Sequence, residues 1–272
     1  KSLGNSISPD DTVKKYGAEL VRLWAASSDY HADVRCSENI FKQLSESYRK
    51  IRNTARIMMA NLGDFDPDRD LVAYDDMLDI DKWIVAQMNR LTKLCIESYD
   101  EYEFHMVYHA INKFCTIDLS KLYVDITKDR LYVEKADSAS RRSGQSALYL
   151  VLSDLVRLLA PIISFTAEEI WKAMPHSSSD KLESVFLNDM PEYSKAYEFE
   201  GLAEKWDKQF MFRDDVMKAL EIARAEKKIG KSLEAKVCLT VPAEDAFLAE
   251  MPASEFADLL IVSQVSVTVG AG

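Results

Sequence analysis

Apolar residues recur at intervals of three and four along most of the chain up to Gly230, and this spacing constrains the fold more than any other feature. The interval matches the 3.6-residue turn of an α-helix, so each segment can bury one face against a neighbour. Glycine is also scarce, with 8 residues in 272, whereas β architectures with many tight turns consume glycine. The pattern therefore predicts a mainly α fold, a bundle of amphipathic helices.

Breaks in the periodicity set the expected helix limits. The first helix should begin near Thr12 and end before the pattern breaks at Asp29. Capping and stop signals then predict further helices over residues 38–62, 79–99, 103–131, 138–159 and 202–229. We also expect a short helix through Trp171, opened by a capping box in which Thr166 and Glu169 satisfy free backbone N–H groups.

The pattern changes after Gly230, where apolar and polar residues alternate with a period of two. This alternation predicts strands over residues 235–241 and 261–269, with a helix over residues 243–260 between them. The sequence thus predicts three regions: residues 1–37 form a loop end and a connecting helical segment, 38–200 a helical bundle, and 201–272 a long helix with a small α/β appendage.

Charge and cysteine content limit the class of protein. The chain carries 34 Lys and Arg against 45 Asp and Glu, a formal charge of −11, so its whole surface is not built to coat nucleic acid, although a local basic face is allowed. The four cysteines are scattered, which predicts neither a disulfide framework nor a cysteine zinc site and suits a reducing cytoplasm. No apolar run is long enough for a membrane helix, so we expect no membrane association.

Two short motifs that carry chemistry elsewhere have structural interpretations here. His105 and His109 are spaced like metal ligands on a helix, but Met106 stands where the zincin pattern needs a glutamate. Gly230-Lys-Ser232 resembles the end of a phosphate-binding loop, yet Ala225 replaces its first glycine and the segment follows a helix instead of opening one. We therefore expect no metal site at the histidines and a simple helix end at Gly230.

Two groups of cations are candidates for binding phosphate. Arg49, Arg52 and Arg56 share one helix face, and arginine forks match phosphate oxygens. We expect Arg52 to turn inward toward a carboxylate of the bundle and the other two to reach RNA. A second group surrounds a helix–helix corner and comprises Lys128, Arg130, Lys135, Arg141 and Arg142, of which all but Lys135 are taken as candidate contacts. The alternative for both groups is a solvated face balanced by nearby acids.

Several strings, taken in order, resemble one family. The first five residues, KSLGN, look like the end of the K-M-S-K-S loop of class I aminoacyl-tRNA synthetases. Further strings are similar to isoleucyl-tRNA synthetases of bacterial type: YGAELVRLW (16–24), YRKIRNTAR (48–56), YVDITKDRLY (123–132), LLAPIISFTAEEIW (158–171) and ARAEKKIGKSLEA (223–235). Valyl enzymes are the nearest alternative, but they typically carry an N-K-L-W-N-A-like string where this chain has RKIRNTA. A helical protein-interaction scaffold that never meets RNA is a further alternative.

The resemblance implies a function and a place in a longer protein. It implies that the chain is the region that binds the anticodon stem and loop in an isoleucine–tRNA ligase. The whole enzyme would be a monomer that uses ATP with Mg as cofactor and isoleucine and tRNA(Ile) as substrates. Lys1 and Ser2 would be catalytic residues at the end of the signature loop, with Lys1 on the ATP phosphates, where it stabilises charge in the transition state.

The resemblance also indicates what this chain lacks. The nucleotide-binding fold would precede Lys1 and a zinc-binding knuckle would follow Gly272, and the cysteines of that knuckle are absent. The chain opens without an initiator methionine, as expected of a piece of a longer protein. We therefore expect this region to be inactive by itself.

Overall fold

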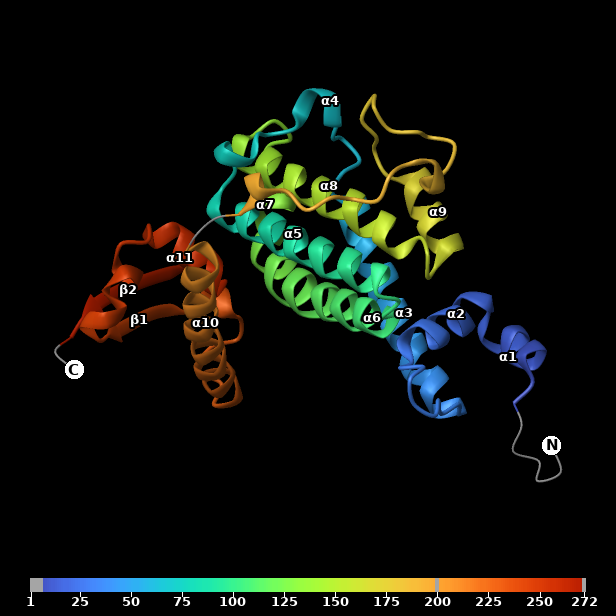
Figure 1. Ribbon diagram of the computed structural model, residues 1–272. Helices are drawn as coiled ribbons and strands as arrows, with labels where there is room; N and C mark the ends of the chain where they lie inside the picture. The colour runs from blue at the N-terminus through green and yellow to red at the C-terminus, as the bar shows by residue number, and fades with distance from the viewer. Residues whose placement is uncertain (1–6, 199–200, 271–272) are drawn as a thin grey trace. The chain divides into compact units, whose positions relative to one another are not determined.

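The chain folds into two compact units, and the first ends at residue 198. The structure is a computed structural model that describes residues 7–198 and 201–270 (Figure 1). The described part of the first unit, Lys1–Glu198, consists of helices and the loops that join them, and the second, Phe199–Gly272, joins helices to a two-stranded sheet. The mainly α fold, with its described strands confined to residues after Leu233, is confirmed.

The first unit holds nine α-helices among its described residues, together with single 3-10 turns and one π-helical segment. The α-helices are α1 (Pro9–Tyr16), α2 (Ala18–Ser27), α3 (Glu38–Ala60), α4 (Pro67–Asp70), α5 (Asp79–Asp100), α6 (Phe104–Lys113), α7 (Asp125–Val133), α8 (Ala139–Leu159) and α9 (Ser164–Ala173). The π-helical segment, Phe114–Val124, joins α6 to α7. The 3-10 turns are Tyr74–Asp76, Val185–Leu187 and Lys195–Tyr197.

The core of this unit lies between α5 and α8, which pack side by side (Figure 1). Their facing side chains are fully buried, among them Ile84, Met88, Leu148 and Leu152. The π-helical segment and α6 cover α5 from another side. Burial of these apolar faces drives the assembly, at about 25 cal/mol per Å² of apolar surface removed from water.

Serine hydroxyls cap the starts of two long helices. The Ser37 hydroxyl accepts the Ile40 N–H at the start of α3, and the Ser138 hydroxyl accepts the Arg141 N–H at the start of α8. The first predicted helix is instead two helices, because Gly17 takes a backbone φ of +88° that an L residue rarely adopts. The spacing of apolar residues cannot detect such a single-residue break.

Two further predictions differ from the structure. The predicted helix 103–131 changes to π-helical turns at Phe114, where the Ser120 hydroxyl donates to the carbonyl of Cys115, five residues back, at 2.7 Å. The predicted capping box is wrong, because α9 begins at Ser164, so that Thr166 lies inside its first turn and bonds Glu19 of α2. A tertiary partner replaces the local one.

A buried ionic network crosses the core beside α8. Asp81 is fully buried and accepts hydrogen bonds from Arg130 at 2.6 and 3.0 Å, from the Tyr123 hydroxyl at 2.6 Å and from the Ser143 hydroxyl at 2.5 Å. Gly144 allows this approach, because a Cβ atom there would lie 3.2 Å from an Arg130 nitrogen. The network therefore connects α5, α7, α8 and the π-helical segment.

The second unit is a small α/β structure that includes the long helix α10 (Leu202–Ala225). Strands β1 (Lys236–Val241) and β2 (Gln264–Val269) pair in parallel, in register from Lys236 opposite Gln264 to Val241 opposite Val269. The crossover between them is a 3-10 turn, Ala243–Ala249, followed by α11 (Ala253–Leu260). It is not the continuous helix predicted over 243–260, because Pro252 disfavours helical backbone in the residue before it.

Candidate nucleic-acid interface

Helix α3 turns its cations away from the core. Ile51, Ala55 and Met58 are buried on its inner face, while Arg49 and Arg56 lie exposed on the opposite side. The helical rotation of 100° per residue produces this division, since residues three, four and seven apart share a face.

Arg52 forms an ion pair with a carboxylate of the bundle. Its guanidinium donates to the Glu169 carboxylate at 3.2 Å and to the Tyr48 hydroxyl at 3.1 Å. The same hydroxyl donates to Glu19 on α2 at 2.9 Å. This pair links α3 to α9, but it is a surface pair, because 47% of the Arg52 side chain and 66% of the Glu169 side chain are exposed.

Arg49 and Arg56 have no such partner. Within residues 7–198 and 201–270, neither guanidinium forms a hydrogen bond or an ion pair. They lie seven residues apart on the same exposed face, so their like charges are not neutralised by any neighbouring carboxylate in the described chain. An arginine offers five N–H donors in a planar fork, which suits the oxygens of an external phosphate.

Arg130 is occupied inside the protein. Only 13% of its side chain is exposed, and both of its terminal nitrogens bond the buried Asp81 carboxylate. The structure therefore gives Arg130 a structural role in place of the RNA contact that the charge pattern suggested. The acid that occupies it lies 49 residues away in the sequence, too far for any local pattern to reveal.

Arg141 and Arg142 are also engaged, by the segment that follows α3. Arg141 donates to both oxygens of Asp64, at 2.7 and 2.9 Å, and Arg142 donates to the backbone carbonyl of Asp64 and to the amide oxygen of Gln145. The Arg141 guanidinium holds the pKa of the Asp64 carboxyl at about 2, well below its usual range. These contacts fasten the segment to α8 instead of presenting two free cations.

Lys128 on α7 remains available. Its ammonium contacts Asp125 at 2.9 Å and is partly exposed. Such surface pairs contribute little free energy, about 0 to 1 kcal/mol, so an external phosphate competes readily for the lysine.

Helix α3 lies against the neighbouring π-helical segment, where the Thr54 and Ser120 hydroxyls are 3.0 Å apart. Arg49, Arg56 and Lys128 thus belong to one unit, and the π-helical segment lies against both α3 and α7.

The signature-loop residues and the histidines are the remaining candidates that the sequence named. Lys1 and Ser2 lie outside the described residues. The side chain of His105 contacts Glu103 at 3.3 Å, and among the described residues no group of three or more His, Cys, Asp and Glu side chains is arranged to hold a metal. No helix in that part of the chain combines the length and apolar character needed to cross a bilayer.

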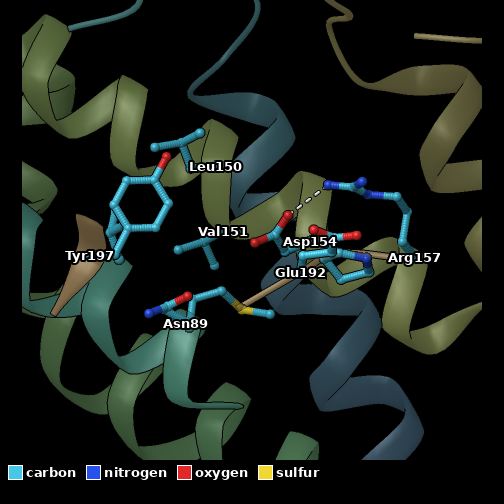
Figure 2. A pocket seen from close by; sticks show the side chains of 10 residues that line it. Asn89, Leu150, Val151, Asp154, Arg157, Glu192 and Tyr197 are labelled. Atoms are coloured by element: carbon cyan, nitrogen blue, oxygen red, sulfur yellow. Dashed lines mark hydrogen bonds and ion pairs between the residues drawn. The ribbon is translucent and has the colours of Figure 1, made fainter. Parts of the chain in front are cut away.

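A pocket of about 280 Å³ opens between α5, α8 and residues 191–197 (Figure 2). Figure 2 shows Asp154 and Arg157 linked on one side of it and Tyr197 on the other. The pocket walls desolvate Asp154, of which 27% is exposed, and raise the pKa of its carboxyl to about 6.

The pocket is not built for an anion. Arg157 donates to Asp154, to the Ser153 carbonyl and hydroxyl and to the Asp189 carbonyl, so its N–H groups are already engaged. The other charges in the lining are the carboxylates of Asp154 and Glu192. The exposed arginines of α3 are therefore the better site for phosphate. No sequence pattern predicts the pocket, since Asp154 and Arg157 look like an ordinary helical ion pair.

Comparison with known proteins places this geometry in context. A family model described as the anticodon-binding domain of tRNA ligase matches residues 81–239. The isoleucine–tRNA ligase of Caldanaerobacter subterraneus subsp. tengcongensis is 51% identical over 237 residues, which cover 87% of this chain and 25% of that protein. That of Geobacter sulfurreducens is 48% identical over 274 residues, which cover 100% of this chain and 29% of the relative.

The chain thus spans between a quarter and a third of the length of these curated relatives. A solved structure of the agnB2 LeuRS of Agrobacterium radiobacter K84, in a ternary complex with tRNA and LeuAMS, is similar in fold, with a TM-score of 0.54 and 18% identity. The match covers 72% of this chain and 22% of that one. The resemblance to isoleucyl-tRNA synthetases is confirmed, which favours it over the valyl alternative.

Proposed function

This chain belongs to the family of anticodon-binding domains of tRNA ligases, and on that premise we propose that it is the part of an isoleucine–tRNA ligase that binds the anticodon stem and loop of tRNA(Ile). Its partner is therefore RNA, held through the phosphate backbone by cations and through unstacked bases by stacking and hydrogen bonds.

The observation that carries this proposal is the exposed pair Arg49 and Arg56. The other arginines that the sequence singled out are paired, Arg52 with the exposed Glu169 and the rest with Asp81 or Asp64, whereas these two face solvent without a partner in the described chain. Lys128 on α7 is a further candidate contact in the same unit. In a chain with a net charge of −11, uncompensated arginines on one face support a polyanionic ligand.

The activity belongs to the longer protein. We propose that it activates isoleucine with ATP and Mg and esterifies the amino acid to tRNA(Ile), as a cytoplasmic monomer. Lys1 and Ser2 are the catalytic residues that the resemblance assigns to this chain, so no catalytic step is assigned to the rest. One methylene separates isoleucine from valine, and its binding energy of about 1–3 kcal/mol gives only limited discrimination between the two amino acids. An editing site that hydrolyses the valine product would improve this discrimination, and the resemblance assigns no such site to this chain. We expect the chain alone to form no aminoacyl-adenylate.

A titration with labelled tRNA(Ile) at 50 to 200 mM salt tests the proposal. We expect saturable binding, and each of Arg49→Ala and Arg56→Ala should weaken it and flatten the salt slope by about 0.7 to 0.9 per lost contact. Arg69→Ala is the matched control, because Arg69 is equally exposed but already paired with Asp70 at 3.0 Å. The control should bind like the parent chain.

Two outcomes contradict the proposal in different ways. A double Arg49→Ala/Arg56→Ala variant that folds and keeps both affinity and salt slope shows that this face does not contact RNA. A parent chain that binds no tRNA at low salt favours the helical protein-interaction scaffold instead.

A further inference from the structure

Helix α10 ends in a turn that carries a lysine in an unfavourable backbone conformation. The Lys228 N–H donates to the Ala223 carbonyl and the Lys227 N–H to the Arg224 carbonyl, both at 2.9 Å, which is the hydrogen-bond pattern of a Schellman motif. Lys227 occupies its left-handed position with a φ of +58°. Glycine or asparagine usually stands there, because a Cβ atom crowds the neighbouring carbonyl.

The turn is also the most basic short segment of the second unit. Residues 224–236 contain five cations and two carboxylates. Both carboxylates are engaged: Glu226 pairs with Lys228 at 2.7 Å, and Glu234 accepts the backbone N–H groups of Gly230, at 2.8 Å, and of Lys231, whose charge it also faces. Arg224 donates to the neutral hydroxyl of Ser232 at 3.2 Å, which leaves its charge uncompensated.

Lys227 has no acid partner. Within residues 201–270 its ammonium forms no ion pair or hydrogen bond, and the side chain is exposed. A lysine near a helix C-terminus is favoured by the helix dipole, but Arg224 and Lys228 already supply that charge without strain. The dipole therefore does not explain why the strained position holds a lysine.

We propose that this basic turn, formed by Arg224, Lys227 and Lys231, binds a phosphodiester of the tRNA backbone. The inference rests on the proposed function and adds to it a contact in the second unit, separate from the arginines of α3. Residues in sparsely populated backbone conformations cluster at functional sites, and Lys227 differs from Tyr102 and Ile261, which share its conformation, because it carries an exposed, unpaired charge. The Gly-Lys-Ser string that resembled a phosphate-binding loop thus contributes a cation instead of a backbone cradle.

Two variants of Lys227 in the complete 272-residue chain test this. Lys227→Gly removes the charge and relieves the backbone strain, whereas Lys227→Gln removes the charge and keeps the strain. Both should flatten the salt slope of tRNA(Ile) binding by about 0.7 to 0.9, so the affinity of the parent chain falls about threefold more between 50 and 200 mM salt. Only Lys227→Gly should also raise the urea midpoint of unfolding.

Lys218→Gln is the control. Lys218 is exposed on α10 and paired with Asp215 at 3.0 Å, so this variant should leave the salt slope unchanged. If both Lys227 variants bind like the parent chain while Arg49→Ala weakens binding, the turn contacts no RNA and the proposed function stands. If Lys227→Gly is no more stable than Lys227→Gln, the strain argument is refuted. A parent chain that binds no tRNA overturns both proposals.

Discussion

Replacing Arg130 with methionine should destabilise the helical bundle strongly while leaving the tRNA affinity of the folded chain unchanged. The substitution keeps most of the side-chain volume but removes the cation that faces Asp81, a carboxylate with no exposed surface. Two hydrogen bonds of 2.6 and 3.0 Å are lost. A charge left unpaired in a protein interior is expensive because water cannot reach it.

The expected magnitude follows from what remains around Asp81. Breaking a buried ion pair costs about 3–5 kcal/mol, and the hydroxyls of Tyr123 and Ser143 still donate to the carboxylate. We therefore expect the lower end, about 3 kcal/mol, which moves the urea midpoint down by about 1–3 M. Tryptophan fluorescence reports the transition, because Trp24, Trp83 and Trp171 lie in the first unit.

A paired variant provides the control. Asp81→Asn together with Arg130→Met removes both charges, so it should recover at least about 1 kcal/mol of the loss. The reasoning is refuted if Arg130→Met costs less than about 1 kcal/mol, since the pair is then not a buried charge network. It is also refuted if the folded Arg130→Met chain loses tRNA affinity as Arg49→Ala does, because Arg130 then contacts RNA.

Three further predictions concern the same unit. Gly144→Ala should destabilise the chain in urea despite the better helix propensity of alanine, because the new methyl lies 3.2 Å from an Arg130 nitrogen fixed by Asp81. Burial raises the pKa of Asp154 from its ordinary value of 3.8 to about 6. Between these values the folded state binds a proton that the unfolded state has lost, so the free energy of unfolding falls as the pH rises from about 4 to about 6. The urea midpoint of Asp154→Asn should lack this pH dependence. Asp64 behaves oppositely, because its pKa of about 2 lies below the ordinary value. It therefore contributes stability above about pH 4 that is lost as the pH falls toward 2, about 1 kcal/mol after solvent screening of a side chain that is 42% exposed. Arg141→Gln should return the pKa of Asp64, measured by NMR titration, toward the usual value.

The sequence determined the type and order of most elements. Local apolar spacing, with the stop signals that follow α3 and α8, is sufficient to define α3, α5 and α8, whose ends lie within about two residues of the predicted ones. Alternation after Gly230 located both strands. The ordered strings also identified the family, since they are properties of the chain itself and need no coordinates.

Local conformation at single residues escaped that reasoning. Nothing in the apolar spacing distinguishes π-helical turns from α-helical ones over Phe114–Val124, and the residue pattern around Thr166 fits a capping box until Glu19 is brought against it. A helix end or a helix type is decided by small differences in free energy, which a packing partner easily exceeds.

The sequence by itself determined that cations cluster on particular helix faces, and the tertiary structure decided which of them are free. Arg130 and Asp81 are 49 residues apart, Arg141 and Asp64 are 77 apart, and Arg52 meets Glu169 across 117 residues. Charge compensation depends on distance in space, since Coulomb attraction and desolvation act between neighbours in the fold whatever their separation along the chain. For that reason the sequence could supply a set of candidate cations, and only the packed bundle left Arg49 and Arg56 facing solvent without a partner among its described residues.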